Sequence, residues 1–465
     1  MFSDFYDVNA RVFRAGEPFE IELKGRSFQT ALEQFAENEV LYLVLFAGNG
    51  IYQDGKLIRR KVIYRKYPIV FDNASAYSKC VIDAMDEGEY HCCIGTVKED
   101  GIDSAISKLV CEFDIYILED DLYKLTPFKG DMHVHSSYSH CSNKENFPRY
   151  IAACARRNGL DYICMTDHRQ MTSSETLTEF GAEFNSGFKV FKGEECHLPC
   201  KHDETLFRNG LFFGHVHIVN FGGRECVSAY ANNHYEEFCA ELTARAEKID
   251  LPYSFEVRYL MAGADWICEK IHEYGGLAFF CHPCWMSDHM FNMPIPIRDY
   301  ILEQGKFDAV EIIGMSAAEN NLKSYSYSEA NDLGAAFYQD AVIRCGKLLP
   351  VVGNSDSHND ADLTLGTKFT VVFAENTSLE ALQEAIKKGN CAAVTTFDSP
   401  GIAPHVSGSF RLVRYVHFLL RNFYPEHDEL CKAEGILMLN SMRTNKTVKF
   451  ENDNVKDYIR RFFNK

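Results

Sequence analysis

The chain has 465 residues, of which 46% are hydrophobic and 25% are charged, the proportions of an ordinary globular protein with ample core. At one domain per ~100–200 residues, this length predicts two or three domains. Acidic residues outnumber basic ones by 66 to 48, and the net charge of −18 opposes broad contact with a phosphate backbone. We therefore expect no nucleic-acid partner, although a local basic pocket could still hold a small anion.

The amino-terminal residues and the cysteines together predict a compartment. Residues 1–7 lack a basic region followed by an apolar core, and no run approaches the ~20 apolar residues that span a bilayer. Seventeen cysteines without a secretion signal are typical of reduced thiols rather than of a disulfide framework. We therefore expect a cytoplasmic protein that does not interact with a membrane.

Short strands with alternating polar and apolar residues fill the first part of the chain, at residues 19–23, 41–45 and 61–64. Such strands, with turn residues between them, predict an antiparallel β-sandwich over residues 1–126. The motif Asp-x-Gly-x-Tyr-x-Cys at residues 86–92 resembles the tyrosine corner of immunoglobulin-like domains, which implies that the Tyr90 hydroxyl bonds to nearby backbone. The first two strands contain no cysteine to pair with Cys92, so an inter-sheet disulfide is not expected.

After residue 127 the pattern changes to repeated units of helix, glycine and buried strand, with polar residues directly after each of three strands. These polar clusters are Thr166-Asp167-His168, Cys281-His282-Pro283 and Asn354-Ser355-Asp356-Ser357-His358. Alternating helices and strands predict a parallel sheet, and the carboxyl ends of such strands are where a β/α barrel assembles its site. We expect an α/β fold with this barrel over residues 127–398, and helices of residues 399–465 packing on it.

Histidine pairs raise the question of metal binding. His133 and His135 lie two residues apart on an expected strand and would project from one side of it toward a single ion. A pair of satisfied, half-buried histidines explains these two residues equally well, and the further clusters at strand ends favour metal. Cys-His-x-x-Cys-x-His at residues 196–202 suggests a zinc knuckle, but no second pair follows at finger spacing, which favours a loop near a pocket.

Eight pieces of the middle of the chain jointly resemble the PHP family, named for its polymerase-associated and histidinol-phosphatase members. They are Asp-x-His-x-His-Ser at 131–136, Pro148, Gly-Leu-Asp-Tyr-Ile-x-x-Thr-Asp-His at 159–168, Gly-x-Glu at 193–195, a histidine-bearing strand at 215–220, His-Pro at 282–283, Val-Glu at 310–311 and Ser-Asp-x-His at 355–358. The resemblance implies a distorted seven-stranded β/α barrel that carries two or three divalent ions and hydrolyses phosphoesters.

The resemblance also implies a role for individual residues. One ion would be held by His133, His135, Glu195 and Asp356; Glu195 would bridge to a second ion held also by His282 and by His215 or His217; the third would be held by His140, His168 and His358. Asp167 would be a bridging carboxylate or one that supports the ligands, and we expect catalytic roles for Asp356, His358, Glu195 and Asp167. A set of imidazoles and carboxylates suits Zn, Fe or Mn.

Two departures from the family pattern bear on function. His140 stands where many members have Asp, which changes the third site, and Arg169 stands where Asn is common, so that it could bind phosphate or form only a surface ion pair. The layout is also similar to PHP relatives that hydrolyse carbamates or esters. The sequence therefore predicts a metal-dependent phosphoesterase, with a carbamate, ester or amide hydrolase, or a metal-stabilised binding module, as alternatives.

Overall fold

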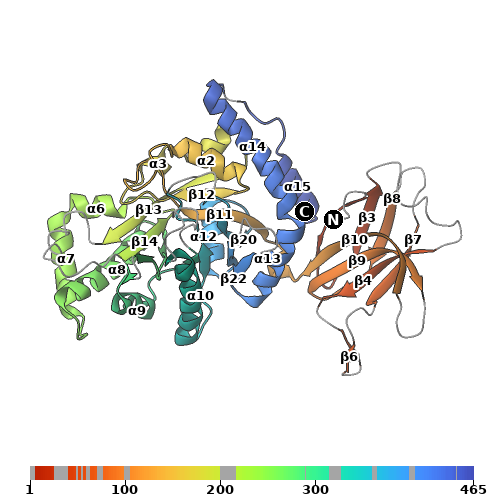
Figure 1. Cartoon of the computed structure of the whole chain (residues 1–465), viewed down its shortest axis with the longest axis horizontal. Helices are drawn as coiled ribbons and strands as arrows, with labels where there is room; N and C mark the ends of the chain where they lie inside the picture. Colours follow the sequence, from red (N-terminus) through yellow and green to blue (C-terminus); the bar gives the residue numbers. More distant parts are fainter. Residues whose placement is uncertain are drawn as a thin grey trace. The chain divides into compact units, whose positions relative to one another are not determined.

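The computed structural model describes residues 6–25, 40–48, 51–53, 56–58, 63–70, 77–98, 105–198, 216–287, 290–313, 326–358, 364–396, 404–446 and 448–465. The chain divides into two compact units (Figure 1). The first comprises Met1–Thr126, His417–Pro425 and Asn454–Lys465, and the second comprises Pro127–Val416 and Glu426–Asp453. The carboxyl-terminal segment expected to pack on the barrel thus contributes to both units.

The first unit is built mainly from two sheets. One has the order β1-β3-β8 and the other the order β2-β10-β9-β4-β7. The strands are β1 (Tyr6–Val8), β2 (Val12–Arg14), β3 (Phe19–Gly25), β4 (Leu41–Ala47), β7 (Arg65–Ile69), β8 (Tyr77–Ile82), β9 (Gly88–Lys98) and β10 (Ala105–Leu118), with a separate pair β5 (Ile51–Gln53) and β6 (Lys56–Ile58). Neighbouring strands are antiparallel except β2 and β10, which run parallel.

Both sheets supply alternate residues to one apolar core, as period-two strands require. Ile21 and Ile82 come from the smaller sheet, and Leu43, Ile94 and Ile115 come from the larger one. The Tyr90 hydroxyl donates to the backbone oxygen of Asp86 at 3.0 Å, the bond expected of a tyrosine corner. Cys92 is a free thiol. An immunoglobulin-like topology stays a prediction.

The second unit is organised around one large, nearly closed sheet with the order β19-β18-β15-β14-β13-β12-β11-β20-β21-β22. Its strands are β11 (Thr126–Val134), β12 (Tyr162–Met165), β13 (Lys189–Leu198), β14 (Val216–Phe221), β15 (Leu277–Phe280), β18 (Ala309–Ile313), β19 (Val351–Gly353), β20 (Lys368–Ala374), β21 (Cys391–Thr395) and β22 (His405–Ser407). Just beyond β19, the Asp356 amide donates to the His133 oxygen at 2.9 Å, which joins this end of the sheet to β11.

The sheet is not wholly parallel, in contrast to the prediction. β14 pairs antiparallel with both β13 and β15, and β20, β21 and β22 pair antiparallel with one another. The repeated helix-glycine-strand pattern from which we expected parallel strands does not precede residues 216–221. Parallel neighbours need a crossover connection, whereas antiparallel neighbours can follow one another directly, so the prediction had no support at β14.

The helices of the second unit follow its strands along the chain (Figure 1). They are α2 (Pro148–Arg157), α3 (Thr172–Glu175), α4 (Phe180–Glu183), α6 (Val227–Asn233), α7 (Tyr235–Lys248), α8 (Phe255–Glu273), α9 (Ile295–Gln304), α10 (Ser326–Cys345), α12 (Leu379–Lys387) and, apart from its first two residues, α14 (Tyr424–Thr444). The first unit contains α1 (Asp120–Tyr123) and α15 (Asn454–Phe462), and α13 (Phe410–Asn422) has residues in both units. Within the described residues, none of the helices is long and apolar enough to cross a membrane.

Candidate metal centre

The site lies where several strands of the large sheet end. His133 is the penultimate residue of β11, Glu195 lies near the end of β13, and His217 lies in β14. His282 follows β15 by two residues, and Asp356 follows β19 by three. Each strand thus brings one or two polar side chains to a common cluster, the arrangement expected of a barrel active site.

Four buried side chains form the centre of the site: His133, His135, Glu195 and Asp356, whose donor atoms lie within 4.8 Å of one another. Nε2 of each histidine lies 3.0–3.5 Å from Glu195 Oε2 and Asp356 Oδ1. In the described part of the chain, none of these four atoms has a hydrogen-bond partner. Ligand atoms around one zinc ion, with bonds of about 2.0–2.1 Å, lie about 3.3 Å apart, so the donors fit a metal ion between them.

The other ring nitrogen of each central histidine is held by a neighbour. Nδ1 of His133 lies 3.1 Å from Glu311 Oε2, and Nδ1 of His135 lies 3.0 Å from Ser139 Oγ. A hydrogen bond at Nδ1 fixes the tautomer and leaves the Nε2 lone pair directed at the cluster. Glu311 is fully buried in the middle of β18 and was not among the predicted site residues. The sequence did mark it, because Val310-Glu311 is one of the pieces that resemble the PHP family, but no role in the site was assigned to it.

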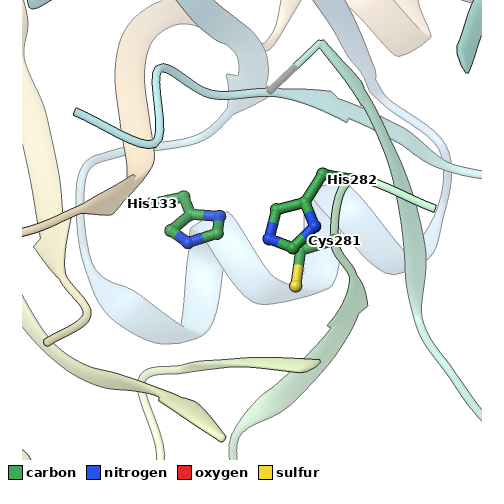
Figure 2. A group of neighbouring side chains, drawn as sticks. All are labelled: His133, Cys281 and His282. Atoms are coloured by element: carbon green, nitrogen blue, oxygen red, sulfur yellow. The ribbon is translucent and has the colours of Figure 1, made fainter. Parts of the chain in front are cut away.

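A second group shares the other oxygen of Glu195. Nδ1 of His217 lies 2.7 Å from Glu195 Oε1, and Nε2 of His282 lies 3.0 Å from the same atom. Figure 2 shows the rings of His282 and His133 directed toward one another beside the Cys281 sulfur. These three residues also place their donor atoms within 4.8 Å of one another. His217 thus lies in the site, whereas His215 lies outside the described residues.

A third group lies beside the first. His135, His168 and His358 place their donor atoms within 4.8 Å of one another, and the Nε2 atoms of His168 and His358 are 3.3 Å apart. The exposed His140, expected here as a ligand, has its ring centroid 6.1 Å from that of His168. The sulfur of Cys141 also reaches this group and lies 3.1 Å from His168 Nε2.

His197 is a site residue that the sequence analysis assigned to a loop. Its Nε2 lies 2.6 Å from His168 Nδ1, and its ring stacks on His217 with centroids 3.8 Å apart. It follows Glu195 by two residues on β13, and residues two apart on a strand share a face. Cys196 between them turns into the apolar core, which argues against a knuckle formed with His197. The rest of that motif lies outside the described residues.

Two further carboxylates support the site from behind. Asp167 accepts hydrogen bonds from the amides and hydroxyls of Ser136 and Ser139 and from the Ser173 hydroxyl, and thereby anchors the turn after β11. Asp131 accepts from the amides of His133 and Ser355, and burial raises its pKa to about 7.

Arg169 has a φ of 59°, and its amide donates to the Glu195 carbonyl at 3.0 Å.

The electrostatics of the cluster favour a cation. Burial alone would raise the pKa values of Glu195 and Asp356, but neighbouring histidines outweigh it and hold both well below their usual range. Burial lowers the pKa of His217 to about 4, so this ring is neutral. Burial also acts to lower the pKa of His168, but Glu195 and Cys141 raise it to about 9. Buried carboxylates therefore attract protons onto rings that a metal ion could bind instead.

Besides Arg169, two of the clustered residues have an unusual backbone conformation. His282 has a φ of 28° and Asp356 a φ of 49°, both in the left-handed region that non-glycine residues seldom adopt. Such conformations cost about 1–3 kcal/mol each and persist where the surroundings impose them, often at functional sites. Here the Asp356 amide bonds to His133 and the His282 amide to Glu311, so both residues are tied to the same strands that supply the other donors.

Comparisons with known proteins give distant structural matches. No family model and no curated protein matches the sequence. A two-domain protein of Bacteroides vulgatus ATCC 8482 containing a predicted PHP-like metal-dependent phosphoesterase is 18% identical, over 59% of this chain and 66% of its own, with a TM-score of 0.37. An endonuclease Q bound to duplex DNA with an abasic lesion is 18% identical, over 56% and 57%, with a TM-score of 0.31.

A third match is the lesion-specific endonuclease PfuEndoQ of Pyrococcus furiosus, 15% identical over 69% of this chain and 84% of its own, with a TM-score of 0.34. The chain spans less than two thirds of the length of the first two structures. At these identities and TM-scores, the likeness does not bear on activity. None of the three is named as a carbamate or ester hydrolase, so that part of the resemblance has no support among them.

Proposed function

We propose that this protein is a metal-dependent hydrolase whose strand-end cluster binds two or three divalent ions. The observation that carries the proposal is the set of four buried, converging donor atoms of His133, His135, Glu195 and Asp356, which have no hydrogen-bond partner within the described residues. Leaving such atoms buried without a partner costs about 1–3 kcal/mol each, more for a charged group. A bound cation offsets that cost.

The proposed division of ligands follows the three groups of side chains. The first ion would be held by His133, His135, Glu195 and Asp356, the second by Glu195, His217 and His282, and a third by His168 and His358, with His140 as the ligand that the family resemblance implies. Nitrogen and carboxylate donors suit Zn, Fe or Mn. A PHP-type barrel of seven strands, an immunoglobulin-like domain at 1–126 and a helical extension at 399–465 belong to the same proposal.

When bound, the ions would lower the pKa of water toward ~7 and neutralise charge on the substrate. The protein's own residues prepare the pocket for this chemistry. Glu311 and Ser139 hold the two central imidazoles with Nε2 facing the pocket. Asp167 fixes the turn that carries Ser139, and Glu195 presents one oxygen to each of two groups of histidines. Asp356 would orient the attacking water, which is its proposed catalytic role.

The charge of the pocket favours a phosphoester over a neutral carbamate or ester. Among the described residues, the carboxylates of Glu195 and Asp356 converge with the histidines at the centre, and Glu311 lies behind them. Two divalent ions carry four positive charges, one more than these three carboxylates neutralise, which suits an anionic substrate and the charge that develops during its hydrolysis. Arg169, next to His168 in the chain, is proposed to add to this charge. A small phosphorylated molecule is the proposed substrate.

The direct test is metal analysis of the purified protein followed by assays on phosphomonoesters, phosphodiesters, carbamates and esters, with duplex DNA containing an abasic site as a further substrate. We expect chelator-sensitive hydrolysis of a phosphoester. His133→Ala and Asp356→Ala should each lose bound metal and nearly all turnover, while the exposed His234→Ala serves as the matched control and should change neither. Full activity in both site variants would rule out the metal mechanism. Bound metal without turnover on any substrate would instead favour a binding module.

A further inference from the structure

Cys141 contacts the third group of histidines directly. Its sulfur is 3.1 Å from Nε2 of His168, whereas the neighbouring His140 is near His168 only by a ring contact, with centroids 6.1 Å apart; both Cys141 and His140 are exposed. A thiolate is a strong ligand for zinc and iron and binds together with imidazole in many sites. The set Cys141, His168 and His358 thus has the composition of a metal site.

The turn that carries Cys141 is fixed on both sides. On one side, Ser139 donates through its amide and its hydroxyl to Asp167. On the other side, the Ser142 hydroxyl donates to the His358 backbone oxygen at 2.7 Å, and the Asn143 amide donates to the same oxygen at 2.9 Å. These bonds tie the segment around Cys141 to the strand ends that carry His168 and His358. The backbone position of Cys141 is therefore set by the fold.

The Nε2 atoms of His168 and His358 face one another. Nδ1 of His358 lies 2.9 Å from the backbone oxygen of Asp356 and so acts as a donor, which leaves a lone pair on its Nε2. Nδ1 of His168 lies 2.6 Å from His197 Nε2, and the Nε2 atoms of His168 and His358 are 3.3 Å apart. That separation matches two ligands of one tetrahedral ion, about 3.3 Å, so a cation bound between the two nitrogens would replace the proton that joins them in its absence.

We infer that Cys141, in place of His140, is the third protein ligand of a metal ion held with His168 and His358. This inference rests on the proposed metal centre and adds a thiolate to a site expected to contain only imidazole. Ligation would release the thiol proton to solvent. A site with one sulfur and two nitrogen donors selects zinc or iron over manganese and magnesium, which prefer oxygen ligands. The other explanation of the 3.1 Å contact is an S–H bond donated to His168.

Cobalt(II) distinguishes these two explanations, because a thiolate bound to cobalt gives a charge-transfer band in the near ultraviolet that imidazole and carboxylate do not give. We expect the band in the cobalt-loaded wild-type protein. It should be lost in Cys141→Ser and retained in Cys281→Ser, since Cys281 lies beside the second group. His140→Ala should retain it too. Cobalt that binds without the band, or a band that survives in Cys141→Ser, would overturn the role of Cys141 and leave the metal centre standing. A wild-type protein that binds no cobalt or zinc would overturn the metal centre and this inference together.

Alkylation of the wild-type protein tests the same ligand without any substitution. Both Cys141 and Cys345 are exposed thiols, so Cys345 is an internal control. Zinc should suppress labelling of Cys141, as measured by peptide mass analysis, and leave labelling of Cys345 unchanged. Equal labelling of Cys141 with and without bound zinc would contradict the inference, even if Cys141→Ser were too unstable to purify.

Discussion

At the scale of single residues, Glu311 can orient two proposed metal ligands without being a ligand itself. Its carboxylate lies 3.1 Å from His133 Nδ1 and also accepts from the His282 amide at 3.3 Å. It therefore orients one ligand of the first group and one of the second. Partners of this kind raise ligand basicity, and their loss typically weakens metal binding 10–100-fold.

Glu311→Gln keeps the size of the side chain and removes its charge. We expect zinc affinity, measured by competition with a chelating dye, to fall by roughly 10–100-fold. Glu303→Gln, an exposed residue of α9 paired with Arg344, is the matched control and should bind zinc like the wild type. Equal affinities for Glu311→Gln and the wild type would reduce Glu311 to a buried residue without influence on the metal.

The sequence identified those site residues that belong to short motifs with a fixed spacing between the metal-ligand candidates. His133, His135 and Asp356 belong to short motifs at strand ends, and the fold brings them together. The choice between His140 and Cys141 could not be read from the sequence. Which of two adjacent residues faces a cluster depends on the backbone of their turn, and distant residues such as Asp167 set that backbone.

At the scale of elements, a buried network of charges holds α14 against α2 and β11. Arg156 of α2 pairs with Glu434 of α14 at 2.9 Å, and Lys129 of β11 pairs with Asp428 at 2.9 Å. His427 is fully buried, with its Nε2 3.0 Å from Asp161. Burial alone would lower the pKa of His427, but Cys431 and Asp161 outweigh it and raise the pKa well above its ordinary value.

This raised pKa predicts how stability depends on pH. Because the folded protein holds the His427 proton more tightly than the unfolded chain does, the contribution is complete below about pH 6.5, the unfolded value, and is lost as pH rises through the folded pKa. His427→Gln should therefore be destabilised by about 3–5 kcal/mol at mildly acidic pH, with the deficit shrinking towards alkaline pH. Urea denaturation of both proteins across this range measures it. A deficit that grew with pH would contradict a charged His427.

Gly435 marks the closest approach between α14 and α2. A Cβ at this position would collide with the backbone nitrogen and Cα of Arg157. In an exposed helix, Gly→Ala gains about 1 kcal/mol, but forcing an extra methyl group against backbone costs about 1–3 kcal/mol or more. Gly435→Ala should therefore lower the melting temperature, whereas Lys432→Ala on the exposed side of α14 should change it little. A higher melting temperature for Gly435→Ala would show that the two helices separate easily.

Helices and strands could be predicted from the sequence where the spacing of apolar residues was regular. The expected units of helix, glycine and strand are present, as in α2, Gly159 and β12. The direction of β14 and the partners of α14 were not predictable. Apolar spacing reveals which face of an element is buried, but not the element against which it is buried, and polar contacts such as Arg156–Glu434 leave no periodic signal.

At the scale of the whole molecule, the chain returns to its first unit at its end. The first segment of that unit ends at Thr126, where the sequence pattern also changes. Residues 417–425 and 454–465 form its other two segments. The backbone amide of Arg11 donates to the Phe462 oxygen at 2.9 Å. Composition and the spacing of apolar residues can suggest a boundary in the chain. They contain no information about a later segment that belongs to the same unit some 300 residues further on.

Within this unit, α15 closes an aromatic cluster. Phe423 stacks on Tyr458 with centroids 5.4 Å apart, and the Tyr458 hydroxyl donates to the Phe423 oxygen at 3.1 Å. Tyr116 of β10 contacts Phe418, which in turn contacts Phe462. The side chains of Val455, Tyr458, Phe462 and Phe463 are all buried. At about 1.5–3 kcal/mol for each large apolar side chain, they contribute as much as a domain's net stability of about 5–15 kcal/mol.

Deletion of residues 454–465 should therefore unfold the first unit while the second keeps its metal. We expect limited proteolysis to cleave within residues 6–126 much faster in the truncated protein than in the wild type, with zinc content per chain unchanged because no donor of the cluster lies in the deleted segment. Lys456→Ala, an exposed change on α15, is the control and should be cleaved at the wild-type rate. Equal protection of the truncated protein would mean that the sandwich is stable without α15. Loss of zinc on truncation would instead mean that stability is coupled between the two units.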